Sequence, residues 1–524
     1  MNKYIQKTLN FLKQEHLDYL LVNSTNEFLV EYNDLQKNSR YFLTGFSGST
    51  GEALVSQDKI YLFVDGRYHA QADLEVDKND IDVIKLQVSD NMLDAICEKV
   101  KNNSTFAICS KKISQSKYEY IKNKLNDKNV DVKLYKNDII INSGNNIPQK
   151  IQEIKLSDTG KTTKEKISEI SENLKDNEAV IVTNLEDLSY IYNIRNFNKQ
   201  HSCSVEGKAV ITKKDDSLFK DETLNSFEVY IRNLKNYNFI TDKNSVSAYD
   251  FSILTEIGTC TNKIITSKNI KTHQEIEHYK KAFNKTDKAI LATRDYINQN
   301  SNLSEYDIKI ELEKNFKKYG AISQSFDSIV AIDENSAVVH YTFPSKEKIL
   351  KEGSIVLIDC GGYYEGGLAT DTTRVFVKGQ ASDEKKKIYT TVLKAFLKSI
   401  KADKFNCGND IDNIAREFLS NNSPEGYIFN HGLGHGIGIN VHETPPRLGV
   451  KSEESLYKLK DNMCFTIEPG LYKQNNFGIR LENSCYLKDN KINAFTKIGF
   501  EKSLIDYKLL DEQEILWLNE FGVI

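Results

Sequence analysis

A short stretch in the last third of the chain carries two aspartates that point to metal chemistry. Residues 354–377 read SIVLIDCGGYYEGGLATDTTRVFV, in which an apolar run ends at Asp359 and a glycine-rich turn leads to Asp371. An ionised carboxylate at the end of a buried strand needs a compensating partner, because burying an unpaired charge is costly. No Lys or Arg lies between the two aspartates, so a metal cation is the natural partner.

Three side chains further along complete a candidate ligand set. His435 lies in HGLGHGIGINVH, Glu468 in CFTIEPGLY and Glu482 in GIRLEN. Four carboxylates and one imidazole form a hard, oxygen-rich set with enough charge for two divalent cations. Structural zinc sites prefer Cys and His, so the set favours manganese or cobalt, with iron and zinc left open. Paired metals that hold a bridging hydroxide and polarise a carbonyl are a recurrent solution for hydrolysis.

The local sequence around these ligands favours extended backbone. In an extended GIRLEN, Arg480 and Glu482 share one face, which points the carboxylate into a polar site beside a cation. Glycine occupies every second position from 432 to 438. A helix there would lose about 1 kcal/mol per glycine relative to alanine. An extended segment instead puts His431 and His435 on the same side, with bare backbone opposite.

Each feature alone has a simpler explanation, as a cap, a surface histidine or a turn. The order of the features is the stronger evidence, because all five ligands occur in one segment, from Asp359 to Glu482. The ordered set D…D…HGxGH…VHE…EPG…RxEN resembles the pita-bread metallopeptidases, the family of methionine aminopeptidase, prolidase and aminopeptidase P.

The elements that must position these residues fall into three predicted parts. A chain of 524 residues is too long for one core. Mixed helical and strand-like segments up to the polar, Pro-containing stretch at 141–150 predict an α/β domain over residues 1–150. A second domain is predicted over residues 151–269. The hydrophobic pattern changes after it, and the remaining chain, 270–460 and 461–524, holds every ligand.

The second domain appears as a weak repeat of the first in the printed sequence. Thr25-Asn26 precedes GEALV, which begins at Gly51, and Thr183-Asn184 precedes GKAVI, which begins at Gly207. The spacings from asparagine to glycine are 25 and 23 residues. Chance is a fair alternative, but the match predicts two related α/β domains in tandem.

The third part begins with helices. Apolar residues from Ile276 to Ile297 recur at helical intervals and predict a long amphipathic helix. A capping motif, Ser304-Glu-Tyr-Asp307, precedes a second helix. The tail LLDEQEILWLNEFGVI predicts another amphipathic helix, whose only tryptophan, Trp517, we expect to pack on the third domain or on a dimer partner.

The resemblance covers nearly the whole chain and narrows to aminopeptidases P of the three-domain cytosolic type. It rests on RYFLTGFSGSTGEALV (40–55), VDGRYHAQA (64–72), VTNLEDLSYIYNIRN (182–196) and SFDSIVAIDENSAVVHY (325–341). It implies an α/β (α+β) fold with two tandem creatinase-N-like domains, then a pita-bread catalytic domain with a short C-terminal extension. Prolidase shares the ligands but not the tandem organisation or the tail.

The resemblance also implies a role for each ligand. Asp359 would bind one metal, and His435 with Glu468 the other, while Asp371 and Glu482 bridge the two. His435 and Glu468 would thereby also contact the substrate. Glu468 would accept the proton of the attacking water and pass it to the departing nitrogen.

Four further residues match positions near the substrate in this family. His340 would steady the tetrahedral intermediate, His442 would contact the substrate carbonyl, and His431 would be a further active-site histidine. Arg67 would reach the mouth of the active site. The alternative for Arg67 is a purely structural role, in a salt bridge with Asp65 or another neighbour.

Three departures from the family pattern stand out. The gap from Asp359 to Asp371 is 12 residues, one more than is usual, which predicts a bulge in the turn. The gap from His435 to His442 is 7 residues, as in the shorter bacterial form. The second domain is also shorter than usual, which leaves its boundaries open.

The function expected from the resemblance is metal-dependent removal of one amino acid from peptides with proline in second position. The alternatives are prolidase activity on Xaa-Pro dipeptides and, from another class, a non-catalytic pita-bread module that binds peptides. All five ligands are present, which argues against the last. We expect peptide substrates and a homodimer.

Composition and charge describe an ordinary globular protein. Hydrophobic residues make up 39% and charged residues 27%, and the formal net charge is −4, which predicts neither nucleic-acid nor membrane partners. The first 22 residues lack the apolar core of a signal peptide. The eight cysteines are widely spaced without a CxxC pair, which is typical of reduced thiols in the cytoplasm.

Overall fold

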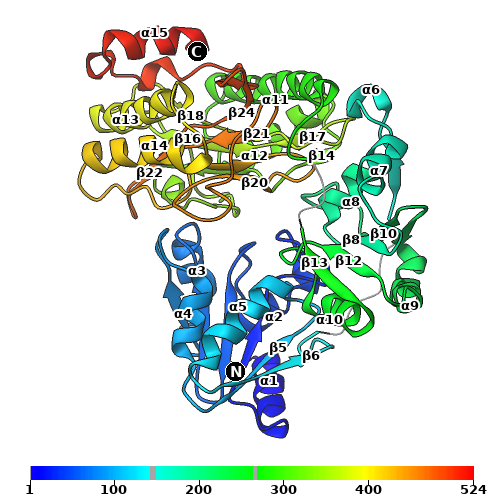
Figure 1. The fold of residues 1–524 in the computed structure, drawn as a ribbon. Coiled ribbons are helices and arrows are strands. Elements are labelled where there is room, and N and C mark those ends of the chain that lie inside the picture. Colours follow the sequence, from blue (N-terminus) through cyan, green and yellow to red (C-terminus); the bar gives the residue numbers. More distant parts are fainter. Residues whose placement is uncertain (1, 142–148, 264–267) are drawn as a thin grey trace. The chain divides into compact units, whose positions relative to one another are not determined.

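The computed structural model describes residues 2–141, 149–263 and 268–524, which form two compact units (Figure 1). One unit comprises Met1–Lys150, Thr162–Tyr192 and Val205–Thr266, and the other comprises Ile151–Lys161, Asn193–Ser204 and Ser267–Ile524. Most of the predicted boundary stretch 141–150 lies outside the described residues.

The first unit begins with a six-stranded sheet of order β4-β3-β2-β1-β5-β6. Its strands are β1 (Tyr19–Val22), β2 (Glu52–Ser56), β3 (Ile60–Val64), β4 (Ile81–Lys85), β5 (Thr105–Cys109) and β6 (Asp131–Tyr135). Its helices are α1 (Lys3–Gln14), α2 (Ser39–Thr44), α3 (His69–Glu75), α4 (Met92–Lys99) and α5 (Gln115–Asn126). Apolar side chains cover both faces of this sheet and form two core clusters.

A second sheet in the same unit has the order β11-β10-β8-β12-β13. Its strands are β8 (Glu178–Val182), β10 (Gly207–Thr212), β11 (Asp216–Lys220), β12 (Asn238–Thr241) and β13 (Thr259–Asn262). The accompanying helices are α7 (Thr163–Ser171), α8 (Leu185–Ile191), α9 (Phe227–Asn233) and α10 (Ala248–Ile257).

The two sheets share one topology, as the weak sequence repeat predicts. β1 pairs antiparallel with β2 and parallel with β5, and β8 pairs in the same two ways with β10 and β12. A further parallel strand follows in each case, β6 in the first sheet and β13 in the second. The edge strand β4 occurs only in the first sheet.

The second unit is built around β16 (Ile355–Cys360), the middle strand of a sheet with β15 (Ile329–Ile332) and β18 (Thr372–Val377). Ile355 and Leu357 pack in one core with α13 (Asp383–Ile400) and α14 (Gly408–Asn422). Val356 and Ile358 pack in another core with α11 (His273–Gln299) and α12 (Glu305–Lys318). Because alternate side chains of a strand face opposite sides, both faces of β16 are buried.

The remaining strands of this unit complete its framework. A five-stranded sheet has the order β20-β19-β21-β24-β25. Its members are β19 (Gly434–Gly436), β20 (Glu443–Leu448), β21 (Cys464–Ile467), β24 (Asn483–Lys488) and β25 (Lys491–Ala494). Two short ladders join β22 (Gly470–Tyr472) to β23 (Gly478–Arg480) and β14 (Ser323–Gln324) to β17 (Gly362–Tyr363).

Two segments of the predicted second domain pack within the C-terminal unit instead. Their strands β7 (Ile151–Glu153) and β9 (Ile194–Asn196) form a ladder, and α6 (Leu156–Thr159) follows β7. The buried Arg195 donates a hydrogen bond from Nε to the carbonyl of Gly367 at 2.8 Å. The predicted domain 151–269 is therefore divided between the two units, and its boundaries stay a prediction.

The C-terminal tail forms α15 (Glu512–Phe521), which packs on α13 as expected for the third domain. The buried carboxylate of Glu514 lies 2.9 Å from Lys394 Nζ and 3.2 Å from Lys398 Nζ. Leu518 is buried in the same core, and Trp517 packs against its edge.

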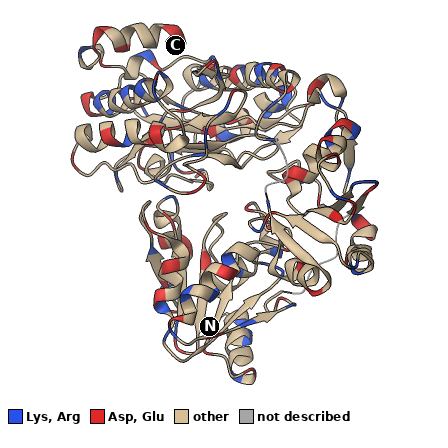
Figure 2. Ribbon diagram, in the orientation of Figure 1, with Lys and Arg blue, Asp and Glu red and all other residues tan. Residues whose placement is uncertain are grey.

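Charged side chains of both signs are interspersed along the helices of both units (Figure 2). Among the described residues, no helix combines the length and the apolar character that crossing a membrane requires.

Packing of the tail predicts a matched pair of stability effects. Leu518 is 1% exposed and Leu516 on the same helix is 60% exposed. We expect Leu518→Ala to lower the free energy of unfolding by about 2–5 kcal/mol, because it leaves a cavity. Leu516→Ala should change it by less than about 0.5 kcal/mol. Urea denaturation measures both, and equal effects would contradict the observed docking of α15.

Candidate metal centre

Asp359 and Asp371 lie at one end of the β16–β18 ladder. Asp359 pairs with Thr373 and Cys360 with Thr372, in a register that continues without a shift from Ile355. The 12-residue gap between the two aspartates is therefore closed beyond Cys360 by a turn, in which Gly367 adopts a positive φ of 64°. The bulge expected in this turn stays a prediction.

The two glutamates lie together because their strands are neighbours. Ile467 of β21 pairs with Asn483 of β24, so the adjoining Glu468 and Glu482 fall at the same end of that ladder. The backbone N–H of Glu482 donates to the carbonyl of Thr373, and the Thr373 hydroxyl donates to Glu482 Oε2 at 2.8 Å. This pair of contacts joins the β18 side of the site to the β24 side.

His435 is carried by β19, where glycines allow close packing of backbone. A Cβ at Gly434 would lie 2.0 Å from the carbonyl oxygen of Thr466, and one at Gly436 would lie 2.5 Å from that of Glu443. Nδ1 of His435 lies 3.0 Å from the Gly436 carbonyl. A proton held there leaves the lone pair of Nε2 free toward the carboxylates.

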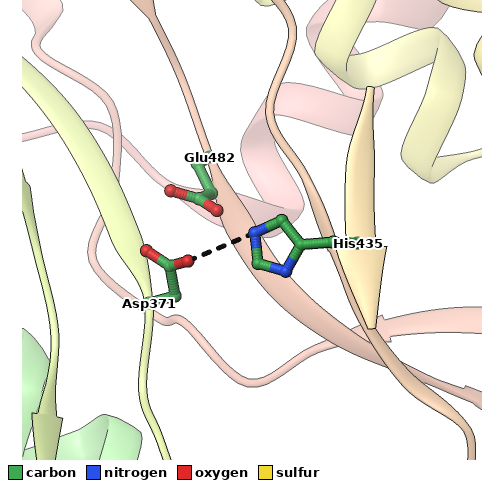
Figure 3. Close-up of side chains that lie close together, drawn as sticks. All are labelled: Asp371, His435 and Glu482. Atoms are coloured by element: carbon green, nitrogen blue, oxygen red, sulfur yellow. Dashed lines mark ion pairs between the residues drawn. The ribbon is translucent and has the colours of Figure 1, made fainter. Parts of the chain in front are cut away.

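Three of the predicted ligands come together as a cluster (Figure 3). One ligand atom each of Asp371, His435 and Glu482 lies within 4.8 Å of the other two. His435 Nε2 lies 3.5 Å from Asp371 Oδ2 and 3.5 Å from an oxygen of Glu468. The sequence therefore predicted residues that converge from β19 and from the ends of β18, β21 and β24.

The carboxylates crowd one another in a site shielded from water. Burial raises the pKa of Asp371 well above its ordinary value, and the charges of Asp359 and Glu468 raise it further. Burial, followed by Asp371 and Glu468, likewise raises the pKa of Glu482. Such a cluster of like charges is stable only with added positive charge or with some of the groups protonated.

Unused acceptor atoms in the cluster fit a cation. Oδ1 of Asp359 and Oε1 of Glu482 are buried and accept no hydrogen bond from the described residues. Buried carboxylate oxygens are normally paired, so two such unpaired oxygens, one of them on a glutamate that clusters with His435, suit a divalent metal. The donor set therefore fits the predicted metal centre.

A basic residue does pair with one of the aspartates, which the sequence argument missed. Arg480 is buried and donates from Nη2 to Asp359 Oδ2 at 2.6 Å. It also donates to the Tyr472 hydroxyl at 2.9 Å and to the Val339 carbonyl at 3.3 Å. The absence of Lys or Arg between the two aspartates did not reveal this partner. One guanidinium still leaves most of the negative charge of the cluster uncompensated.

The predicted accessory histidines occupy different surroundings. The ring of His442 lies 4.3 Å, centroid to centroid, from that of His435. Nε2 of His431 lies 3.0 Å from the Tyr472 hydroxyl, which also accepts a hydrogen bond from Arg480. Arg480 donates a hydrogen bond to the carbonyl of Val339, the residue before His340. The catalytic roles of these residues stay predictions.

Arg67 belongs to the other unit. Its guanidinium donates to both carboxylate oxygens of Asp65, at 3.0 and 2.8 Å, and to the Thr50 hydroxyl at 3.0 Å. The salt bridge that the sequence offered as an alternative is therefore present, and a role at the active site stays a prediction.

Family models match most of the chain. The model described as metallopeptidase family M24 matches residues 277–489, and two models described as creatinase/prolidase N-terminal domains match residues 5–138 and 145–317. The chain therefore contains two creatinase-type N-terminal domains followed by an M24 metallopeptidase domain of the pita-bread type. The predicted fold class is confirmed.

Individual relatives agree with this organisation. Xaa-Pro aminopeptidase 1 of Dictyostelium discoideum is 27% identical over 99% of this chain and 92% of its own length. An uncharacterized peptidase of Methanocaldococcus jannaschii is 39% identical over 46% of this chain and 65% of its own length. The solved X-prolyl aminopeptidase of Caenorhabditis elegans has a TM-score of 0.90 at 21% identity, covering 99% of this chain and 94% of that one.

Removal of cluster ligands should lower metal binding. We expect Asp371→Asn and Glu482→Gln each to reduce bound divalent metal by at least one ion per chain, because each replaces a charged ligand with a neutral one. Activity should fall at least about 100-fold. Metal analysis of purified protein is the measurement, and Glu514→Gln, which alters a buried carboxylate on the tail, is the control. Full metal content in both ligand variants would contradict the assignment.

Proposed function

We propose that this chain is a metal-dependent aminopeptidase that hydrolyses the first bond of peptides with proline in second position. The observation that carries the proposal is the ordered ligand set of Asp359, Asp371, His435, Glu468 and Glu482, in a chain that matches an Xaa-Pro aminopeptidase over 99% of its length. The family, the fold and the gathered ligands all support this activity.

Two divalent ions, manganese in our proposal, would be held by the five ligands. Asp359 would hold one ion, His435 and Glu468 would hold the other, and Asp371 and Glu482 would contact both. Bound ions of this kind lower the pKa of a water and polarise the peptide carbonyl. The pair fits the dinuclear active site named for the enzyme from Caenorhabditis elegans.

The remaining steps are assigned to side chains of this chain. Glu468 accepts the proton of the attacking water and passes it to the proline nitrogen as that nitrogen departs. His340 donates a hydrogen bond to the oxyanion that develops on the first carbonyl, and His442 contacts the same carbonyl. His431 holds the Tyr472 hydroxyl, and binding of the peptide by Arg67 is proposed from the family resemblance alone.

Selectivity for proline has a simple physical basis. An Xaa-Pro bond is a tertiary amide without an N–H group. A site that required an N–H donor at this position would reject the bond, whereas a pocket fitted to the ring accepts it. A free amino terminus held near the metals limits the reaction to one residue.

Prolidase activity is the alternative within the same family. Prolidases share the ligand set, but the two tandem creatinase-type domains and the near-complete match to an Xaa-Pro aminopeptidase favour the longer substrates. A non-catalytic binding module would not need all five ligands.

A metal-titrated assay on short peptides tests the proposed activity. We expect chelated protein to be inactive and manganese to restore release of the first residue from an Arg-Pro-Pro tripeptide, because the ligands are carboxylate-rich. Only one residue should leave each peptide. A matched Arg-Ala-Ala tripeptide is the control and should be a poor substrate. Cleavage of Xaa-Pro dipeptides alone would instead identify a prolidase.

We further propose a cytoplasmic homodimer whose partners are peptides rather than nucleic acid or membrane. The weak net charge of −4 argues against nucleic-acid and membrane partners, and the description of the Caenorhabditis elegans enzyme as cytosolic supports the location. Light scattering on purified protein should give twice the chain mass of 59.9 kDa, as the family resemblance leads us to expect. A mass equal to one chain at working concentration would contradict the dimer.

A further inference from the structure

The loop that carries His340 is tied to the metal centre on one side. The loop follows β15 and begins with a short helix at Asp333–Ala337. Ser336 exchanges hydrogen bonds with the backbone of Gly478, accepting from its N–H and donating to its carbonyl, both at 2.9 Å. Arg480, two residues further, donates to the carbonyl of Val339 at 3.3 Å. The backbone just before His340 is thus hydrogen-bonded to β23, whose Arg480 also pairs with Asp359.

The other side of the loop is held by one buried carboxylate, that of Glu305. Oε1 accepts from the Ile332 N–H at 2.7 Å and from Asn335 Nδ2 at 2.9 Å. Oε2 accepts from the Tyr341 hydroxyl at 2.7 Å and from the Ser345 N–H at 2.9 Å. The four donors lie between Ile332, at the end of β15, and Ser345, and one of them is the residue next to His340.

Glu305 is an unusual residue to find without exposure to solvent. It is 0% exposed, although it occupies the first position of α12, where a glutamate is ordinarily solvated. No ion pair to its carboxylate is among the described contacts, so the positive end of the helix and the four hydrogen bonds supply its stabilisation. An ionised carboxylate offers about four acceptor positions, and all four are used here.

Only a carboxylate satisfies all four donors. A glutamine amide offers acceptor positions on one atom and two N–H donors on the other. Whichever way the amide is turned, a backbone N–H of the loop would face another N–H, at Ile332 or at Ser345. Leaving a buried donor unpaired is costly, so the loop would shift to relieve it.

We propose that Glu305 is the positioning residue for His340. By holding Tyr341 on one side, while Arg480 holds Val339 on the other, it keeps His340 at the place where the proposed reaction needs a hydrogen-bond donor. The inference rests on the proposed function, because His340 acts there on the substrate. Displacement of a catalytic group by about 1 Å can cost about 100-fold in rate.

A double-mutant comparison tests the inference. Under saturating manganese, we expect Glu305→Gln to lower kcat on an Xaa-Pro-Xaa peptide about 10- to 100-fold. Bound metal should not change. In a His340→Ala background the same change should lower kcat no further, because the group it positions is gone. The control Glu514→Gln, which also alters a buried carboxylate, should keep kcat within about 2-fold.

A milder variant covers the case in which Glu305→Gln fails to fold. Tyr341→Phe removes one of the four donors and leaves the ring, so kcat should fall about 5-fold. This loss should also vanish in the His340→Ala background. A normal kcat in Tyr341→Phe, or losses that multiply with that of His340→Ala, would overturn the inference, because a general structural role predicts independent effects.

Amide hydrogen exchange gives a readout that needs no activity. In the full-length, manganese-loaded Glu305→Gln protein, exchange at Ile332 or at Ser345 should accelerate at least about 10-fold, while that of α15 stays unchanged. Unchanged exchange at both amides would overturn the inference alone. Failure of the unmodified protein to cleave any Xaa-Pro peptide would overturn the proposed function, so the two failures are distinguishable.

Discussion

The structure depends on gathering four carboxylates in a buried site. Asp359, Asp371, Glu468 and Glu482 repel one another, and burial strengthens that repulsion by removing the water that would screen it. The protein itself supplies one positive charge, the guanidinium of Arg480, and the imidazole of His435 adds a ligand atom. A divalent metal centre would provide the remaining positive charge, which explains why two buried carboxylate oxygens accept no hydrogen bond from the described residues.

A rigid framework is needed to hold groups that would otherwise move apart. β16 is packed on both faces, and its regular ladder with β18 fixes the two aspartates at one end. The glutamates flank the β21–β24 ladder, and Thr373 connects the two sheets through Glu482. Glu305 extends the same design to the loop of His340, with a buried carboxylate that is fully satisfied by protein donors. Buried carboxylates thus have two roles in this protein. Those with unpaired oxygens suit a metal ion, and that of Glu305, whose oxygens are paired, holds a loop.

Several of these features could be predicted from local sequence. The apolar run before Asp359 marks a buried strand, and alternating glycines around His435 mark an extended segment that packs closely on its neighbours. The tandem α/β domains were visible only as a faint repeat, yet the two sheets have the same order of pairing. The ion pair of Arg480 with Asp359 left no local signal, because it joins residues 121 positions apart.

By itself the sequence determined the residue types, their order and the strands and turns that carry them, because hydrophobic periodicity and glycine act over a few residues. Only the tertiary structure decided which charges meet. It paired Arg480 with Asp359, placed the 151–161 and 193–204 segments with the C-terminal unit, and set Glu305 against the loop of His340. These contacts join residues distant in the chain, and their strength depends on burial, which no single segment of sequence contains.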